Sequence, residues 1–232
     1  MNRFPLKSNK EIQGKLKEEL RKDDRRILLG VTGGVASGKT TVARMIENLG
    51  AFTIDFDLLS RVVVEPHKPA WEEILSYFGK QVLLADKTLD RGKLSQIVFR
   101  NPAKRKKLES ILHPRIFDEF SGRVRDYAAK DPHAIIQAVV PLLFEAKIQH
   151  FFDKILLVYI PPEMQAERLI QRNRISRKMA ANIIKAQLPI EGKKGHADFV
   201  IDNSGTLGET ARQVRKVWRE LKRLQKPKVS DR

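Results

Sequence analysis

ILLGVTGGVASGKTTVARMIENLGAFTID, residues 27–55, is the stretch that decides the fold. Residues 27–33 form a short apolar, partly β-branched run that ends in glycine, which predicts a buried parallel strand. Apolar side chains then recur at helical spacing over residues 42–49, and Gly50 stands where a helix commonly ends. A second strand follows at residues 51–55. The order is strand, helix, strand, which predicts a right-handed βαβ unit.

A glycine-rich loop joins the first strand to the helix. It reads GGVASGKT over residues 33–40 and fits the pattern G-x-x-x-x-G-K-[ST]. Its glycines let backbone N–H groups turn inward around phosphate oxygens, and the helix directs its positive dipole end to the same place. We expect Lys39 to reach the β- and γ-phosphates of a nucleoside triphosphate, Thr40 to offer its hydroxyl to Mg²⁺, and Thr41 to bond an inner phosphate.

The chain is basic, and its charge is concentrated at the two ends. Its 232 residues carry a formal charge of +17. Residues 1–26 contribute +4 and residues 211–232 contribute +7. We interpret the first segment as an N-terminal extension and the second as a helix end with a tail, both solvated, with weak nonspecific attraction to polyanions and no specific nucleic-acid partner.

The chain has no cysteine and no apolar run near the roughly 20 residues that a membrane helix needs. Its N-terminus lacks the apolar region of a secretory signal. These features predict a cytoplasmic protein without a membrane partner.

Beyond the first βαβ unit, strand-like and helix-like segments continue to alternate. Residues 66–130 are mainly helical and predict an inserted subdomain, whose last long helix is broken at His113-Pro114. Thr206 and Glu209 form a capping box that opens a final helix. The pattern predicts an α/β domain over residues 27–210 with a doubly wound parallel sheet. Its later strands are expected within residues 134–144, 153–162 and 198–203.

Two carboxylates follow the second predicted strand. Asp55 and Asp57 alternate along an extended segment, so both can face the cleft at the carboxyl end of the sheet. One could orient or deprotonate an attacking hydroxyl, and the other could reach Mg²⁺ directly or through water. For Asp57, an Asx turn that leads into the next helix is an equally good interpretation.

An arginine-rich helical segment lies late in the chain. Arg168 and Arg172 are four residues apart and share one helix face. They could form an ordinary solvated surface. We favour a lid over about residues 163–187 that closes on the triphosphate and neutralises its charge.

The chain resembles the dephospho-coenzyme A kinases, which are P-loop kinases. The resemblance spans about residues 27–205 and has a specific order and spacing. It is carried by the motifs GVTGGVASGKTTVA (30–43), IDFDLLSR (54–61), LDRGKLSQIVF (89–99), LESILHPRI (108–116), VPLLFE (140–145), QAERLIQR (165–172), AQLP (186–189) and ADFVIDNSG (197–205).

The resemblance implies ATP-dependent phosphorylation of the ribose 3′-hydroxyl of dephospho-CoA, with Mg²⁺ as cofactor. It makes Asp55 the group that activates this hydroxyl, with Lys39 and Arg168 as its catalytic partners. It also implies that Arg61, His113 and Pro114 help to shape the acceptor site in the helical subdomain, although Arg61 could instead pair with a carboxylate and His113-Pro114 could simply kink a helix. The implied ATP-binding set is Gly33, Gly34, Val35, Ala36, Ser37, Gly38, Lys39, Thr40, Thr41, Arg168 and Arg172.

Three positions depart from the family's usual pattern. Phe56 stands between the aspartates in place of alanine, and could narrow the pocket or pack on a helix. Asp86-Lys87-Thr88 replaces a turn with Asp-Gly, and Asn173 replaces a common aspartate after the lid arginine.

Two other functions compete with this one. The chain could be a related kinase acting on a nucleoside, shikimate or gluconate, although the helical insert and VPLLFE argue against this. It could also be an RNA-binding P-loop protein that uses its basic ends, but those ends carry few aromatic side chains on which bases could stack.

Overall fold

The computed structural model describes Gly14 and residues 26–225. These residues form two compact units. The sheet unit comprises residues 26–55 and 126–225, and the helical unit comprises residues 56–125. The expected N-terminal extension and the C-terminal tail lie mostly outside the described residues.

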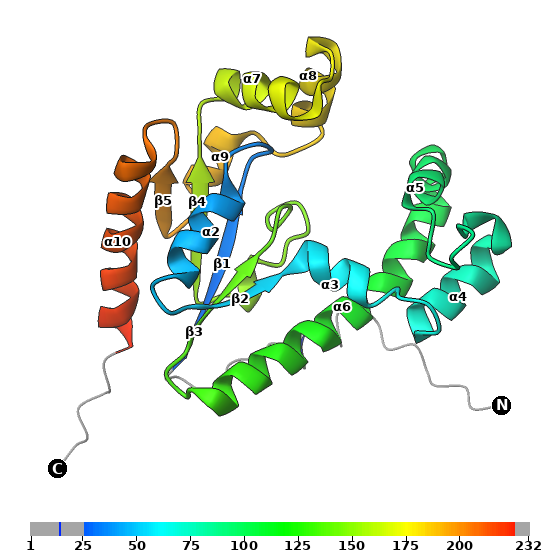
Figure 1. Cartoon of the computed structure of the whole chain (residues 1–232), viewed down its shortest axis with the longest axis horizontal. Coiled ribbons are helices and arrows are strands. Elements are labelled where there is room, and N and C mark those ends of the chain that lie inside the picture. The colour runs from blue at the N-terminus through cyan, green and yellow to red at the C-terminus, as the bar shows by residue number, and fades with distance from the viewer. Residues whose placement is uncertain (1–13, 15–25, 226–232) are drawn as a thin grey trace. The chain divides into compact units, whose positions relative to one another are not determined.

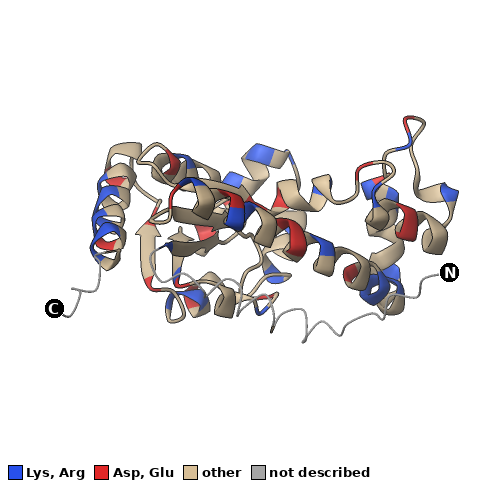
Figure 2. Ribbon diagram, turned by 90° about the horizontal axis from the view of Figure 1, so that it is seen from below, with Lys and Arg blue, Asp and Glu red and all other residues tan. Residues whose placement is uncertain are grey.

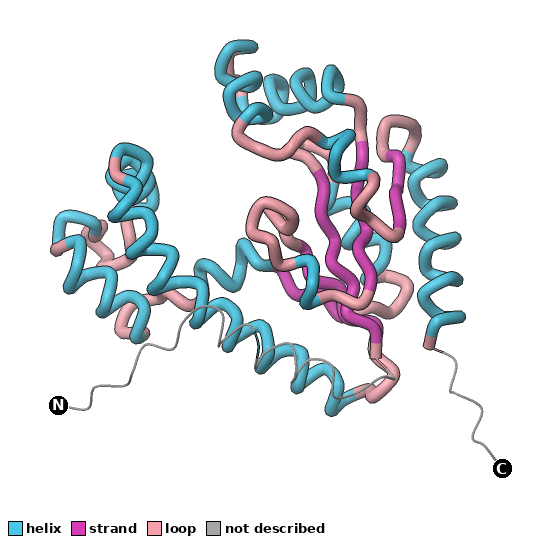
Figure 3. The backbone as a smooth tube through the Cα atoms, turned by 180° about the vertical axis from the view of Figure 1, so that it is seen from behind, coloured by secondary structure: helices cyan, strands magenta, loops and turns pink. Residues whose placement is uncertain are grey.

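Five parallel strands form the sheet, in the order β2-β3-β1-β4-β5 (Figure 3). From the central strand β1, the chain first builds β2 and β3 on one side and then β4 and β5 on the other. The predicted doubly wound α/β fold is therefore confirmed. The strands are β1 (Ile27–Gly33), β2 (Phe52–Asp55), β3 (Ile135–Val139), β4 (Lys154–Tyr159) and β5 (Phe199–Asp202).

Helices α2 (Lys39–Glu47) and α10 (Leu207–Leu224) pack together on one face of the sheet (Figure 1). Alternate residues of β1 point to this face, as the pleat of a strand requires. On the opposite face, Gly30 lies against Leu143 and Phe152, where a Cβ atom would be only 2.7 Å and 2.9 Å from their side-chain carbons. The core under the two helices comprises Ile27, Leu29, Val31, Val42, Ile46, Ala51, Ile135, Leu156, Val158, Ile201, Val214, Val217 and Leu221.

Helix α10 begins with the predicted capping box. Thr206 accepts a hydrogen bond from the Glu209 backbone, and the Glu209 carboxylate accepts one from the Thr206 backbone. The buried stripe of the helix leaves its basic side chains exposed, so blue bands run along it in Figure 2. These residues are Arg212, Arg215, Lys216, Arg219, Lys222 and Arg223.

The helical unit has its own apolar core. Asp90 accepts a hydrogen bond from the Lys93 N–H at 2.9 Å and caps the helix that follows. Buried side chains such as Trp71, Ile74 and Ile111 pack together. The helices of this unit are α3 (Phe56–Val62), α4 (Pro69–Phe78), the short 3₁₀ helix η1 (Lys80–Val82), α5 (Arg91–Arg100) and α6 (Pro102–Lys130), which continues into the sheet unit.

The predicted break at His113-Pro114 is wrong, because Pro114 lies inside the continuous helix α6. Proline cannot donate to the carbonyl of residue 110, and its ring disturbs the ladder there. The Arg115 guanidinium donates to the Ile111 carbonyl at 2.7 Å and supplies a donor in this turn. Ile111 and Phe117 are buried on either side of the proline, so packing keeps both halves in one helix.

The strand expected within residues 134–144 is shorter than predicted, because β3 ends at Val139. Pro141 has no N–H with which to continue the ladder, and the following residues form turns. Leu143 and Phe144 of the VPLLFE motif are still buried in the core. The remaining helices are the 3₁₀ helix η2 (Gln149–Phe151), α7 (Pro162–Asn173), α8 (Arg177–Lys185) and α9 (Ile190–Lys194), of which α9 was not predicted.

Candidate active site

The loop between β1 and α2 curls around its own backbone. Ala36 has φ 59° and Gly38 has φ 87°, the left-handed region that lets successive N–H groups point inward. Gly38 has a second reason to be glycine, because a Cβ atom there would lie 2.2 Å from the side-chain nitrogen of Asn203. Helix α2 starts at Lys39 and adds its positive dipole end.

Lys39 folds back over the start of the loop. Its ammonium group donates to the carbonyl of Gly33 at 3.0 Å and to that of Gly34 at 2.8 Å. A positive charge is therefore held beside the inward-pointing amides, where a polyphosphate would need it.

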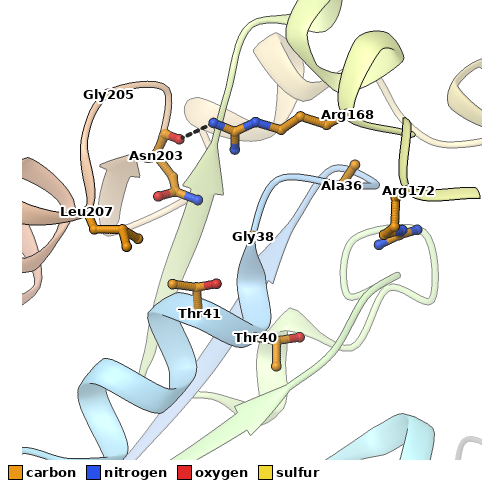
Figure 4. Close-up of a pocket in the computed structure, with 9 residues that line it drawn as sticks. All are labelled: Ala36, Gly38, Thr40, Thr41, Arg168, Arg172, Asn203, Gly205 and Leu207. Atoms are coloured by element: carbon orange, nitrogen blue, oxygen red, sulfur yellow. Dashed lines mark hydrogen bonds between the residues drawn. The ribbon is translucent and has the colours of Figure 1, made fainter. Parts of the chain in front are cut away.

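A cavity of about 540 Å³ opens beside this loop. Its size falls within the usual range for a small-molecule site. The loop, the helix α7 and the segment after β5 all contribute to its wall (Figure 4). The lining residues are Ala36, Gly38, Thr40, Thr41, Arg168, Arg172, Asn203, Gly205 and Leu207.

The two lid arginines reach this cavity from α7 but are held differently. Arg168 is half-buried and donates from Nη2 to the main-chain carbonyl of Asn203 at 3.1 Å. Arg172 is exposed and donates from Nε to the side chain of Asn173 at 2.9 Å. The helix ends directly afterwards, at Arg174 with φ 52°.

The sequence did not identify Asn203, whose side chain joins three parts of the site. Its amide nitrogen donates to the main-chain carbonyl of Ser37 at 2.8 Å, and its oxygen accepts from the Thr210 hydroxyl at 2.8 Å. A polar residue directly after a parallel strand is the signal that could have marked Asn203.

Thr40 and Thr41 have exposed hydroxyl groups at the start of α2 and line the cavity. Among the described residues there is no group of three or more His, Asp or Glu side chains that could hold a metal ion alone.

Asp55 ends β2 at the same edge of the sheet as the loop. It pairs in register with Val139 of β3, which in turn pairs with Val31 of β1. Two strand spacings place the Cα atoms of Asp55 and Val31 about 10 Å apart. The carboxylate is half-buried and does not line the cavity of Figure 4.

The other acceptor-side candidates belong to the helical unit. Arg61 is exposed on α3, and His113 and Pro114 are half-buried on α6. Burial lowers the pKa of the Arg91 guanidinium, the positive charge of Arg61 lowers it further, and Asp57 acts in the opposite direction.

The departures from the family pattern have local explanations. Phe56 packs against Phe117 and Phe120 of α6, with ring centroids 6.4 Å and 5.1 Å apart. In the turn at residues 86–88, the Asp86 carboxylate accepts hydrogen bonds from the Thr88 backbone and hydroxyl. These bonds lower the pKa of Asp86. Asn173 serves as the partner of Arg172.

Comparison with known proteins identifies similar sequences and structures. The sequence model of the family described as dephospho-CoA kinase matches residues 27–209. A dephospho-CoA kinase from Syntrophus aciditrophicus is 44% identical over 193 residues, which are 83% of this chain and 82% of that protein. TT1252 from Thermus thermophilus superposes with a TM-score of 0.72 at 29% identity, over 85% of this chain and 98% of that chain. Dephospho-CoA kinase from Campylobacter jejuni superposes with a TM-score of 0.59 at 27% identity, over 85% of this chain and 98% of that chain.

Proposed function

The chain belongs to the dephospho-CoA kinase family and is a kinase, and we propose that it phosphorylates the ribose 3′-hydroxyl of dephospho-CoA with ATP. The products are coenzyme A and ADP, so the reaction is the last step of coenzyme A biosynthesis. The observation that carries the proposal is a single cavity that joins the glycine-rich loop to two lid arginines, at the sheet edge where Asp55 ends β2. We further propose a cytoplasmic location. Among the described residues, no helix combines the length and apolar character needed to cross a bilayer.

In this proposal the loop and the lid bind the triphosphate. The backbone N–H groups of residues 36–41 donate hydrogen bonds to its oxygens, and the Lys39 ammonium turns to the β- and γ-phosphates. Arg168 and Arg172 neutralise charge on the transferred group from the opposite wall of the cavity. Because the arginines belong to one helix, a movement of α7 would change both contacts together.

Asp55 acts on the acceptor. Its carboxylate accepts the proton of the attacking ribose hydroxyl, or orients that hydroxyl in line with the γ-phosphorus, an effect worth on the order of 10²–10⁴ in rate. Arg61, His113 and Pro114 are proposed to bind dephospho-CoA from the helical unit.

The residues present fit a bound Mg²⁺ ion. Thr40 lines the cavity and would hold the ion through its exposed hydroxyl. When bound, the ion would neutralise negative charge on the phosphate oxygens.

The test is release of ADP by the purified chain with ATP and three rival additions: dephospho-CoA, adenosine or RNA. We expect turnover with dephospho-CoA alone, and a 3′-phosphorylated product by ³¹P NMR. Turnover with adenosine would indicate a different small-molecule kinase. Stimulation by RNA without an acceptor would support the nucleic-acid alternative and reject this one.

A further inference from the structure

One peptide group of the glycine-rich loop is held at both ends. The carbonyl of Gly34 accepts hydrogen bonds from the Lys39 ammonium at 2.8 Å and from the Ser37 N–H at 3.3 Å. The N–H of Val35, which belongs to the same peptide plane, donates to the side-chain oxygen of Gln187 at 3.1 Å. Rotation of this plane would break all three hydrogen bonds.

Because Gly34 has no Cβ atom, its backbone dihedral angles are less restricted than those of any other residue. It is glycine for a packing reason, because a Cβ atom would lie 2.3 Å from the side-chain oxygen of Gln165, which is buried. The orientation of the plane is therefore decided by its hydrogen-bond partners. Two bonds on opposite ends of one amide also polarise each other and strengthen together.

Gln187 is itself held in place by its neighbours. The next residue, Leu188, donates its N–H to the Glu145 carboxylate at 3.0 Å. The same carboxylate oxygen lies 2.7 Å from the ammonium of Lys193, a side chain only 1% exposed. A buried pair of this kind is costly to separate, so it fixes the segment that contains Gln187 to the sheet unit.

Gln187 also lies two residues after the end of α8, the second helix of the proposed lid. The segment that returns from the lid to the sheet thus supplies the partner of the loop amide. Any shift of this segment would be transmitted to the Gly34–Val35 peptide, and from there to the carbonyl that receives Lys39.

We propose that Gln187 is a positioning residue for the phosphoryl transfer, and that it acts through the Gly34–Val35 peptide on the ammonium of Lys39. The inference rests on the proposed function for its kinetic consequence. Its structural part, the hydrogen bond between Gln187 and the Val35 N–H, can be tested without the acceptor.

Two substitutions separate the hydrogen bond from the bulk of the side chain. Gln187→Leu keeps a similar volume and removes the acceptor, and it should lower kcat about five- to tenfold, the value of one such bond. Gln187→Glu keeps an acceptor but adds a negative charge beside the phosphates. It should retain kcat within about threefold and raise the KM for ATP. The matched control is Gln149→Leu, an exposed glutamine of η2 in the same unit.

A measurement in the absence of the acceptor reports the geometry directly. In ¹H–¹⁵N spectra with ADP and without acceptor, Gln187→Leu should shift the Val35 amide resonance strongly, whereas Gln149→Leu should not. The inference is overturned if that resonance is unchanged, if Gln187→Leu has the kcat of the original chain, or if both Gln187 variants lose kcat equally. Inactivity of the unsubstituted chain toward dephospho-CoA would instead reject the proposed function and leave the spectral test in force.

Discussion

Asn203 and Ser37 lie 166 residues apart, and a hydrogen bond of 2.8 Å joins the side-chain amide of the first to the main-chain carbonyl of the second. The other end of the amide accepts from the Thr210 hydroxyl, so this buried polar side chain is paired at both ends. The glycine-rich loop therefore has its support in the last strand and the last helix of the described chain.

Asn203→Leu should weaken ATP binding about tenfold, because it leaves the Ser37 carbonyl without its donor and removes a rigid wall of the cavity. Calorimetric titration with a nonhydrolysable ATP analogue measures the effect. Thr210→Val should cause a smaller loss, since it removes only the bond that orients the amide. Binding by Asn203→Leu at the original affinity would show that the loop does not need this support.

Asp55→Asn should retain ATP binding and lose turnover by about 10²–10⁴, because the amide cannot accept the hydroxyl proton. Parallel measurements of nucleotide affinity and of initial rate with dephospho-CoA separate the two effects. Asp126→Asn, an exposed aspartate in the same unit, is the control. Near-normal turnover of Asp55→Asn would remove this residue from the proposed chemistry.

Arg168→Lys should lower kcat more than Arg172→Lys. The guanidinium of Arg168 donates to the Asn203 carbonyl and also lines the cavity, a double role that the single ammonium of lysine fills poorly. Arg172 is exposed, so Arg172→Lys should lower kcat roughly threefold, whereas Arg168→Lys should lower it about tenfold or more. Steady-state rates with both substrates varied provide the comparison, and equal losses would contradict the distinction.

Glu73→Gln should lower the free energy of unfolding by about 0.5–1 kcal/mol at neutral pH. Burial would raise the pKa of Glu73, but hydrogen bonds and positive charges from Lys107 and Arg115, each 2.9 Å away, outweigh it and lower the pKa. A carboxylate whose pKa is lowered by folding stabilises the protein at pH values above the ordinary carboxyl pKa. This stabilisation is lost as the pH falls through the pKa of the folded state. Urea unfolding at several pH values should show the difference between the two proteins disappearing below about pH 4. A difference that persists there would have another cause.

Lys87→Gly should raise the free energy of unfolding by up to about 1 kcal/mol, because Lys87 has φ 67°, a region in which a side chain is strained. The same replacement at Lys93, an exposed position inside α5, should lower it by about 1 kcal/mol. The midpoints of urea unfolding compare the two. If both glycines destabilise the protein, the turn at residues 86–88 gains nothing from glycine.

Features that depend on neighbouring residues were predicted well. The first βαβ unit and the capping box at Thr206 each follow from side chains within one or two turns. The break expected at His113-Pro114 was wrong, since the continuity of a helix at a proline depends on the packing partners around it. The extent of β3, which ends at Val139, depends on packing partners in the same way.

The glycine-rich loop could be located from its pattern, but its supports could not. Asn203 reaches the loop across 166 residues and Gln187 across 152, and neither residue type shows in isolation which backbone group it will bind. The local sequence therefore identifies the loop that we propose to bind phosphates. It does not identify the distant side chains that hold this loop still.

The bond between Asn203 and Ser37 also has a consequence for biosynthesis. A ribosome makes β1 and the loop early, whereas Asn203 and Thr210 emerge near the end of translation. The nascent N-terminal half would contain the glycine-rich loop before Asn203 is available to support it. We therefore expect a chain truncated before Asn203 to bind ATP more weakly than the full-length chain.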